Sequence, residues 1–286
     1  MSDLSTSFTR ALVRAPAASF VDGLRRVEAG VPVLETALAQ HRRYVAALRA
    51  CGVEPIELPA DPRHADACFV EDTAVLVGTA AMLARPGAPS RRGEVDAVHA
   101  ALVDLGLACA GIVAPATLDG GDVCLAGERA FIGLSERTNA AGADQLGAWF
   151  AGFGIDAATI DIRGFDSILH LKSGLAWLGD GRIAVVEELC SHPLLRDFEP
   201  VVPVAGEAAA ANAVRIGGRV LVAAGHPLFA AQLAGFGLQP LVVDIGEYAK
   251  LDGGLSCLSL RWREPRGQHT LAAATDGPDG SRGDLP

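Results

Sequence analysis

Short apolar runs on either side of a glycine turn recur along the chain and predict β-hairpins. One of these turns is Asp180-Gly181, a dipeptide typical of tight primed turns. Leu255 to Trp262 is a further apolar run without a second arm, and the strand expected over Phe8 to Ala15 could supply that arm. The complete hairpins are expected over residues 69–84, 121–134, 173–186 and 211–224.

Segments with helical spacing separate these hairpins, and short strands follow most of them. Helices are expected over residues 33–51, 93–106, 139–152, 190–198 and 227–236, and strands over 53–58, 159–162 and 240–244. The unit of hairpin, helix and strand therefore repeats about five times, roughly every 40 to 50 residues, which is typical of a radial array or a solenoid. We expect an α/β fold whose units form a ring. A doubly wound sheet is the competing fold, but no G-x-G-x-x-G motif joins a strand to a helix.

Composition limits the classes of partner. Half of the 286 residues are apolar and the net charge is −10, which argues against binding to nucleic acid because that binding needs clustered Lys and Arg. No apolar window is long enough for a membrane span and no signal peptide is apparent, so a cytoplasmic protein is expected. Residues 1–262 are expected to form a single catalytic domain. Residues 263–286 lack periodicity and are rich in Gly, Pro and Asp, so they are expected to be a disordered tail.

The six cysteines form no C-x-x-C pair and are expected to be separate, reduced thiols. Cys257 differs from the others because Gly253-Gly254 lies just before it, and glycines let the backbone turn sharply and approach a ligand. A free cysteine is more often a small core residue than a nucleophile. Cys124 is the rival thiol, and the remaining cysteines are interpreted as packing residues, at positions 51, 68, 109 and 190.

Charged and polar residues interrupt the apolar pattern at the start of several hairpins. In a radial array, equivalent points converge on the central axis, so we expect these side chains and Cys257 to meet in one cavity. Three of these residues also have a structural interpretation: Asp72 and Asp122 could accept backbone N–H groups, and His170 could be a hydrogen-bonded core residue. The residues are Asp66 with Glu71 and Asp72, Asp119 with Asp122, His170 with Lys172, and Asp252 before Cys257.

Such a cluster suits one kind of chemistry. A thiol is only slightly ionised at pH 7, so a nucleophilic Cys257 needs His170 or a cationic ligand nearby. Asp119 could orient the imidazole, as the third member of a triad does. The remaining carboxylates would then be surplus negative charge, and a forked guanidinium would balance it best. The cluster therefore predicts a site for an arginine-like group beside a thiol.

Longer motifs resemble those of the dimethylarginine dimethylaminohydrolase family, within the guanidino-group-modifying superfamily. The resemblance runs from about residue 8 to 262 and implies a five-bladed α/β propeller, the pentein fold, of pseudo-fivefold repeats. The motifs are FVEDTAV (69–75), RPGAPSRR (85–92), LDGGDV (118–123), GLSERTN (133–139), LHLKS (169–173) and DGGLSC (252–257).

Carried over residue by residue, the resemblance implies a nucleophile, Cys257, a general acid and base, His170, and its accompanying carboxylate, Asp119. It implies that the substrate guanidinium and amino ends bind to Asp66, Glu71 and Asp72, and the α-carboxylate to Arg91 and Arg137, with either Arg91 or Arg92 reaching it. Leu24 matches a lid residue.

The implied reaction hydrolyses Nω-methylated arginines to citrulline through a covalent S-alkylthiouronium, without metal or organic cofactor. A homodimer is one arrangement left open. An arginine deiminase, an amidinotransferase and a non-catalytic arginine-binding protein are the alternatives. Against a deiminase, the chain has no insertion for an extra helical domain, and against an amidinotransferase, nothing marks an acceptor-amine site.

Overall fold

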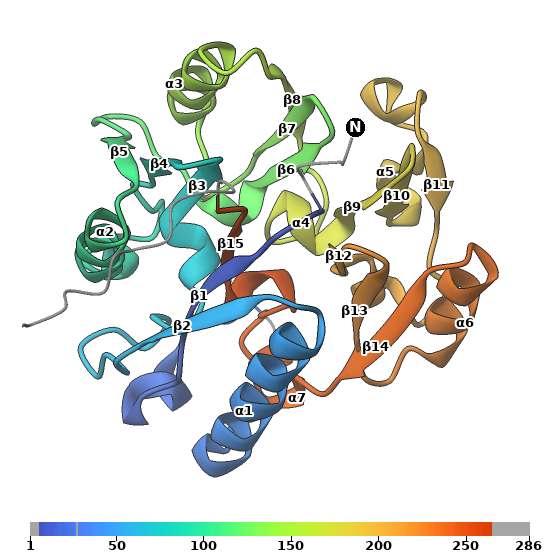
Figure 1. Cartoon of the computed structure of the whole chain (residues 1–286), viewed down its shortest axis with the longest axis horizontal. Coiled ribbons are helices and arrows are strands. Elements are labelled where there is room, and N and C mark those ends of the chain that lie inside the picture. The colour runs from blue at the N-terminus through green and yellow to red at the C-terminus, as the bar shows by residue number, and fades with distance from the viewer. Residues whose placement is uncertain (1–5, 27, 265–286) are drawn as a thin grey trace, which may run out of the picture.

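In the computed structural model, which describes residues 6–26 and 28–264, the strands form five three-stranded sheets with one topology. In each sheet the middle strand pairs antiparallel with one neighbour and parallel with the other. Figure 1 shows the sheets following one another around the middle of the molecule, with the longer helices towards the outside. The repeating unit predicted from the sequence is thereby confirmed.

Four sheets consist of consecutive strands. They are β3 (Ala74–Val77), β4 (Ala80–Leu83) and β5 (Ala108–Gly111); β6 (Val123–Ala126), β7 (Arg129–Leu134) and β8 (Asp156–Asp161); β9 (Leu175–Gly179), β10 (Arg182–Val185) and β11 (Glu199–Val201); and β12 (Val214–Ile216), β13 (Arg219–Ala223) and β14 (Gln239–Val243). The fifth sheet joins the two ends of the chain, in the order β15 (Leu260–Trp262), β1 (Arg10–Arg14) and β2 (Glu54–Leu58). Its register pairs Leu12 with Leu260, so the N-terminal strand supplies the missing arm, as predicted.

A helix carries the chain from the hairpin to the parallel strand in each repeat, because a parallel connection needs a crossover. These helices are α1 (Leu34–Ala50), α2 (Glu94–Asp104), α3 (Ala140–Ala151), α5 (Glu187–Cys190) and α6 (Pro227–Gly235). The helix predicted over 190–198 is wrong: α5 ends at Cys190, and a separate 3-10 turn, η5, covers Pro193–Leu195. Pro193 explains the break, since proline lacks the N–H that a helix interior needs.

One short helical turn precedes the first strand of every sheet. These turns are η2 (Val70–Thr73), η4 (Gly120–Asp122), α4 (Leu171–Gly174), η6 (Ala208–Ala211) and η7 (Ser256–Leu258). The extended strands predicted over 69–77 and 255–262 are therefore wrong at their starts, where η2 and η7 lie. Most of the polar residues singled out in the sequence lie on these turns or directly before them, whereas Asp66 and Asp252 lie four residues before η2 and η7.

Apolar side chains fill the space between each sheet and its helices. Under α3, for example, Leu146 and Phe150 are fully buried in one cluster with Ile132 of β7. Burial of a side chain of this size contributes about 1.5–3 kcal/mol, so this packing fixes the distance from helix to sheet. The segment α7 (Gly246–Ala249) contributes Tyr248 to the cluster that also contains Cys257.

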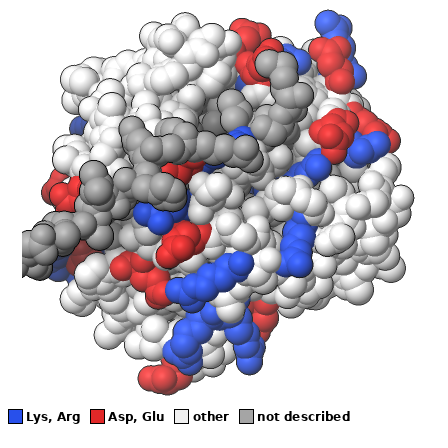
Figure 2. All heavy atoms as spheres, in the orientation of Figure 1, with Lys and Arg blue, Asp and Glu red and all other residues white. Residues whose placement is uncertain are grey.

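Acidic and basic side chains lie beside one another on the face shown in Figure 2. Among the described residues, no helix combines the length and the apolar character needed to cross a membrane. Most of the predicted C-terminal tail lies outside the described residues. Its first two residues are described, and the backbone N–H of Glu264 donates to the Thr9 hydroxyl at 2.9 Å.

Candidate active site

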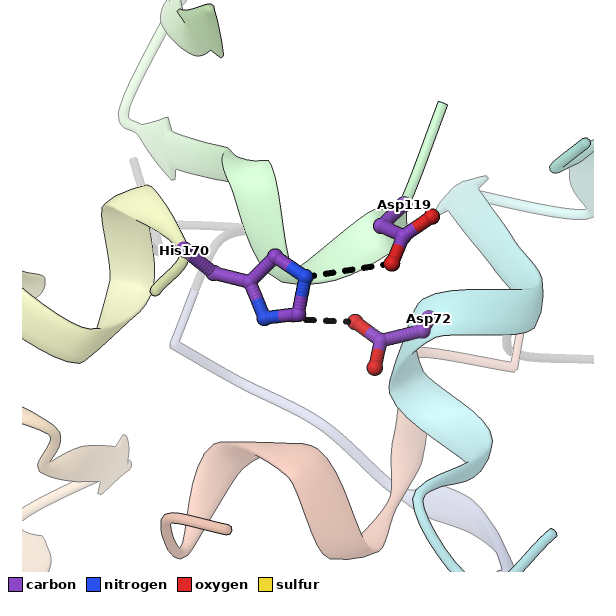
Figure 3. Close-up of side chains that lie close together, drawn as sticks. All are labelled: Asp72, Asp119 and His170. Carbon is purple, nitrogen blue, oxygen red and sulfur yellow. Dashed lines mark hydrogen bonds and ion pairs between the residues drawn. The ribbon is translucent and has the colours of Figure 1, made fainter. Parts of the chain in front are cut away.

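His170 lies at the start of α4, between two carboxylates that come from other repeats (Figure 3). Its Nε2 atom is 3.1 Å from Oδ2 of Asp119, and its Nδ1 atom is 4.0 Å from Oδ1 of Asp72. Gly121 allows this approach, because a Cβ there would lie 2.6 Å from the Asp72 carboxylate and 2.9 Å from the imidazole ring. The structure therefore brings Asp119 to His170, as the sequence predicted.

Asp122 holds the backbone of this arrangement in place. Its Oδ1 atom accepts from the N–H of Leu171, next to His170, and its Oδ2 atom accepts from the hydroxyls of Ser135 and Thr138 at 2.7 and 2.6 Å. Burial raises the pKa of Asp122 to about 6, although His170 and the hydroxyl donors oppose the rise. The structural interpretation of this carboxylate, as an acceptor of backbone N–H groups, is the one that the contacts support.

The carboxylates control the charge of His170. Burial alone would lower the pKa of its imidazole, but Asp72, Asp122 and Asp119 outweigh that effect and raise the pKa to about 9. Burial would likewise raise the pKa of Asp72, but His170 and Arg91 outweigh it and lower the pKa to about 2. At neutral pH the site therefore contains an imidazolium held by carboxylates, a form able to donate a proton.

Cys257 lies on the 3-10 turn η7 rather than at a strand start, and it is 9% exposed. The backbone N–H of Gly254 donates to its sulfur at 3.4 Å. Burial, Glu71 and Asp72 together raise the pKa of the thiol to about 12, against the smaller effects of that N–H and of Lys172. Without a ligand, the thiol is thus protonated at neutral pH.

Most of the predicted site residues line one small cavity of about 100 Å³. The two residues predicted to react, Cys257 and His170, both line it. Residues of this cavity that sequence reasoning did not assign to the site include Arg25, Arg26, Phe69 and Leu251, which carry no distinctive chemical pattern. The predicted residues that line it are Leu24, Asp66, Asp72, Arg91, Arg137, His170 and Cys257, together with Asp252.

Asp66 lies at the part of the cavity covered by the Leu24 segment. The backbone N–H of Leu24 donates to Oδ1 of Asp66 at 3.0 Å, and the N–H of Arg26 donates to Asp252. These bonds hold the segment over the cavity, which suits the predicted lid position of Leu24. Burial raises the pKa of Asp66, and Arg91 only partly offsets this.

Arg91 is buried and already paired. Its guanidinium contacts the carboxylates of Asp72 and Glu94 and donates to the backbone carbonyls of Asp66 and Phe69. Arg92 instead donates from Nε to the carbonyl of Pro86 and does not line the cavity. Of the two adjacent arginines, Arg91 is therefore the one that reaches the site. That it binds an α-carboxylate, alone or with Arg137, stays a prediction.

Glu71 does not line this cavity and faces the other side of η2. Its carboxylate is 2.6 Å from Nζ of Lys172 and 3.0 Å from the guanidinium of Arg261, and it accepts from the Ser256 hydroxyl at 2.6 Å. It lines a separate cavity of about 890 Å³ instead. A 3-10 turn has three residues per turn, so Glu71 and Asp72 point in directions about 120° apart. The expected trio of carboxylates in one cavity is thus reduced to Asp66 and Asp72.

Cys124, the rival thiol, lies on β6 within an apolar cluster that includes Phe131. It does not line the small cavity, and burial raises the pKa of its thiol to about 11.

The possible metal-ligand atoms of Asp72, Asp119 and His170 lie within 4.8 Å of one another and could approach a metal ion. A metal ligand must be a neutral imidazole, however, and the raised pKa of His170 disfavours that form.

Comparison with known proteins agrees with this geometry. The family model for eukaryotic N,N dimethylarginine dimethylhydrolase matches residues 26–189. A Pseudomonas aeruginosa protein named N(G),N(G)-dimethylarginine dimethylaminohydrolase is 37% identical over 256 residues, which cover 89% of this chain and 100% of that protein. A Streptomyces coelicolor protein of the same name is 39% identical over 261 residues, which cover 89% and 97%.

Solved structures extend the comparison to the fold. A cysteine-to-serine mutant of the P. aeruginosa enzyme, complexed with citrulline, superposes with a TM-score of 0.86 at 37% identity and covers 90% of this chain and all of that one. The N-terminal domain of ArgZ, a cyanobacterial arginine dihydrolase, has a TM-score of 0.82 at 17% identity and covers 90% and 98%, a likeness of fold alone. Together, the family model and the relatives show that this chain belongs to the dimethylarginine dimethylaminohydrolase family.

Proposed function

We propose that the protein is a hydrolase that converts Nω-methylated arginines to L-citrulline and methylamine or dimethylamine. One observation carries the proposal: Cys257, His170 and two carboxylates, Asp66 and Asp72, line the same small cavity. Relatives that share more than a third of the sequence are named for this reaction, and one of them is complexed with citrulline.

The charges of the site orient the substrate. The reacting carbon must lie beside Cys257 and His170, and Asp72 is the carboxylate next to His170. The guanidinium end therefore points towards Asp72, and the α-amino end towards Asp66 under the Leu24 segment. Arg137 lines the same cavity and carries the charge that an α-carboxylate needs.

The first half of the reaction forms a covalent bond to sulfur. A bound guanidinium favours ionisation of the Cys257 thiol, whose proton passes to the solvent, and the thiolate then attacks the guanidinium carbon. The imidazolium of His170 gives its proton to the departing methylated amine as the C–N bond breaks. The products of this half are a free amine, a neutral imidazole and an S-alkylthiouronium on Cys257.

The second half releases citrulline. Neutral His170 takes a proton from a water molecule, and the resulting hydroxide attacks the thiouronium carbon. The added hydroxyl loses its proton to the solvent as the C–S bond breaks, which returns the Cys257 thiolate and leaves the ureido group of citrulline. Asp119, hydrogen-bonded to Nε2, keeps the ring in one orientation through both halves. The chain's own side chains perform each step.

Product analysis tests the proposal. Purified protein would be incubated with asymmetric dimethylarginine, monomethylarginine and arginine, and citrulline, dimethylamine, methylamine and ammonia would be measured by mass spectrometry. Citrulline with the methylated amine is expected. Ammonia from arginine at a higher kcat/KM would identify a deiminase instead, and the absence of citrulline from every substrate would contradict the hydrolase.

The proposal includes the organisation of the chain. The sheets are five blades of a closed propeller, since β1 and β15 join both ends of the chain in one sheet. Residues 1–262 act as a single catalytic domain.

The described cysteines are all free, which suits a reducing compartment such as the cytoplasm. Association into a homodimer stays a prediction, which analytical ultracentrifugation would test.

A further inference from the structure

Asn212 is a buried polar residue of the fourth repeat, where sequence reasoning found no functional group. It directly follows η6 and lies two residues before β12. In the other repeats, the corresponding turns carry or adjoin Asp72, Asp119, His170 and Cys257. Asn212 is only 6% exposed, so its amide group needs hydrogen-bond partners within the protein.

The amide group of Asn212 connects the two turns that carry the reactive side chains. Its Nδ2 atom donates to the backbone carbonyl of Lys172 at 2.8 Å and to the hydroxyl of Ser256 at 3.1 Å. Its Oδ1 atom accepts from the backbone N–H of Ser256 at 2.9 Å. Lys172 is two residues from His170 and Ser256 is next to Cys257, so one side chain bridges the catalytic turns.

We propose that Asn212 is a positioning residue that fixes Cys257 relative to His170. This inference rests on the proposed function, because it assigns the reaction to those two side chains. Asn212 does not line the small cavity, so it acts through the turns rather than through contact with substrate.

The contacts need both halves of an amide. A carboxylate could accept from Ser256 N–H but could not donate to the carbonyl of Lys172, and it would place negative charge against that oxygen. The Ser256 hydroxyl already donates to Glu71 at 2.6 Å, so it needs a donor such as Nδ2 on its other side. Asparagine meets all three requirements with one short side chain.

Packing against Gly254 also restricts the amide. A Cβ at Gly254 would lie 2.4–2.6 Å from side-chain atoms of Asn212, so the amide fits closely against the segment leading to Cys257. That segment donates the Gly254 N–H to the Cys257 sulfur. A shift of Asn212 would therefore move the nucleophile as well as the turn that carries His170.

Substitution of Asn212 by aspartate preserves the shape and removes the two donated hydrogen bonds. We expect kcat of Asn212→Asp to fall about 100-fold, as expected for a reacting group misplaced by about 1 Å, while KM stays nearly constant because the cavity residues are unchanged. The rate of Cys257 alkylation by 2-chloroacetamidine, followed by mass spectrometry, should fall in parallel. The thermal midpoint would be measured to separate this effect from loss of folded protein.

The other asparagine of the chain provides a matched control. Asn139 caps α3 and accepts from the N–H groups of Gly142 and Thr117 at 2.8 and 3.1 Å. Aspartate can accept both bonds and is an equally good N-cap. It loses only the bond that Nδ2 donates to the Pro115 carbonyl at 3.3 Å, which joins neither catalytic turn. Asn139→Asp should therefore keep the wild-type kcat and alkylation rate.

Wild-type kcat and alkylation rate in folded Asn212→Asp would overturn the inference, as would losses no larger than those in Asn139→Asp. If the aspartate variant does not fold, Asn212→Ser decides by the same measurements, since serine cannot span both turns. The alkylation rate does not depend on turnover. If the wild type formed no citrulline, the proposed function would be wrong, yet the comparison of alkylation rates would still judge the role of Asn212.

Discussion

The thiol of Cys257 should react slowly with neutral reagents and quickly with cationic ones. Its pKa of about 12 in the unliganded site is about 3 units above that of an ordinary cysteine. A shift of this size leaves about 1000-fold less thiolate at neutral pH. A thiolate of higher pKa is also more nucleophilic, by roughly 20-fold over 3 units, so a neutral reagent should react about 50-fold more slowly than with an unperturbed thiol.

A cation in the cavity reverses this suppression. A unit positive charge about 4 Å from the sulfur is worth about 4 kcal/mol at an effective dielectric constant of 20, or about 3 pKa units. That is enough to return the thiol to its ordinary range. The amidinium of 2-chloroacetamidine supplies this positive charge in the cavity that Asp72 lines, whereas iodoacetamide is neutral and supplies none. Alkylation of the Cys257 peptide would be timed by mass spectrometry with both reagents from pH 6 to 10.

The variant Asp72→Asn makes the test sharper, because its two expected effects have opposite signs. Loss of this carboxylate lowers the Cys257 pKa, so iodoacetamide should react faster. It also weakens binding of the amidinium, so 2-chloroacetamidine should react more slowly. Asp61→Asn is the matched control, since Asp61 is a buried aspartate paired with Arg63 that does not line the cavity. Equal rates and one common pKa near 9 for both reagents would refute the reasoning.

Further predictions concern the reactive residues themselves. Cys257→Ser should form no citrulline from dimethylarginine, whereas Cys124→Ser should keep most of the activity; turnover by the first variant would remove Cys257 as the nucleophile. His170→Gln should lose turnover of dimethylarginine, because departure of the amine and hydrolysis both need the imidazole, while Cys257 should still be alkylated by 2-chloroacetamidine, as intact-protein mass spectrometry would show; complete turnover would contradict this role. The raised pKa of His170, about 9 against 6.5, should stabilise the fold by about 3 kcal/mol below pH 6.5, and this stabilisation should disappear as the pH rises through 9. Urea unfolding at pH 6 and pH 9.5 should therefore show a larger loss for the wild type than for His170→Gln, and equal losses would contradict the ion-pair account.

The fold was largely predictable because each repeat carries short-range sequence signals of its own. Glycine turns between apolar runs are short-range signals, and the regular spacing of these signals predicted the five-unit arrangement. The failures have local causes too. Pro193 interrupts the predicted helix over 190–198. The turns η2 and η7 resemble strand starts because the chain passes from each of them into β3 or β15 within one residue, without a glycine or proline between.

The sequence predicts which site residues lie together when they occupy equivalent positions in the repeats. It does not predict the direction in which a single side chain points. Asp66, Asp72, His170 and Cys257 meet because each lies on or near the turn before a first strand. The prediction placed Glu71 in the wrong cavity, since side chains one residue apart on a 3-10 turn point in directions about 120° apart.

Other features of the site needed pairwise contacts that the sequence hints at only weakly. Arg91 and Glu94 are three residues apart, a spacing that suggests an ion pair but does not show that Arg91 also reaches Asp72. Asn212 was overlooked because it cannot titrate. The available signal was an amide in an alanine-rich run at the fourth equivalent position.

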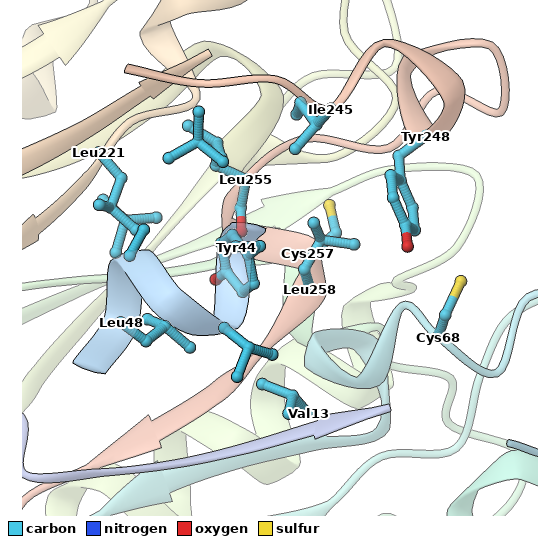
Figure 4. Packing of buried hydrophobic residues seen from close by; sticks show 14 of the residues in the cluster. Val13, Tyr44, Leu48, Cys68, Leu221, Ile245, Tyr248, Leu255, Cys257 and Leu258 are labelled. Carbon is cyan, nitrogen blue, oxygen red and sulfur yellow. Dashed lines mark hydrogen bonds between the residues drawn. The ribbon is translucent and has the colours of Figure 1, made fainter. Parts of the chain in front are cut away.

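Cys257 combines the two characters that its own segment left open, because it is a core residue and also the proposed nucleophile. Figure 4 shows its side chain among buried residues such as Leu255, Leu258 and Tyr248, and burial is the largest cause of its raised pKa. The packing that resembles an ordinary core is thus what keeps the thiol protonated until a cation enters. Neutral electrophiles and oxidants react with thiolates, so the same burial protects the sulfur between turnovers. In this site, we therefore expect selectivity for a cationic substrate to follow from hydrophobic packing as much as from the carboxylates proposed to bind it.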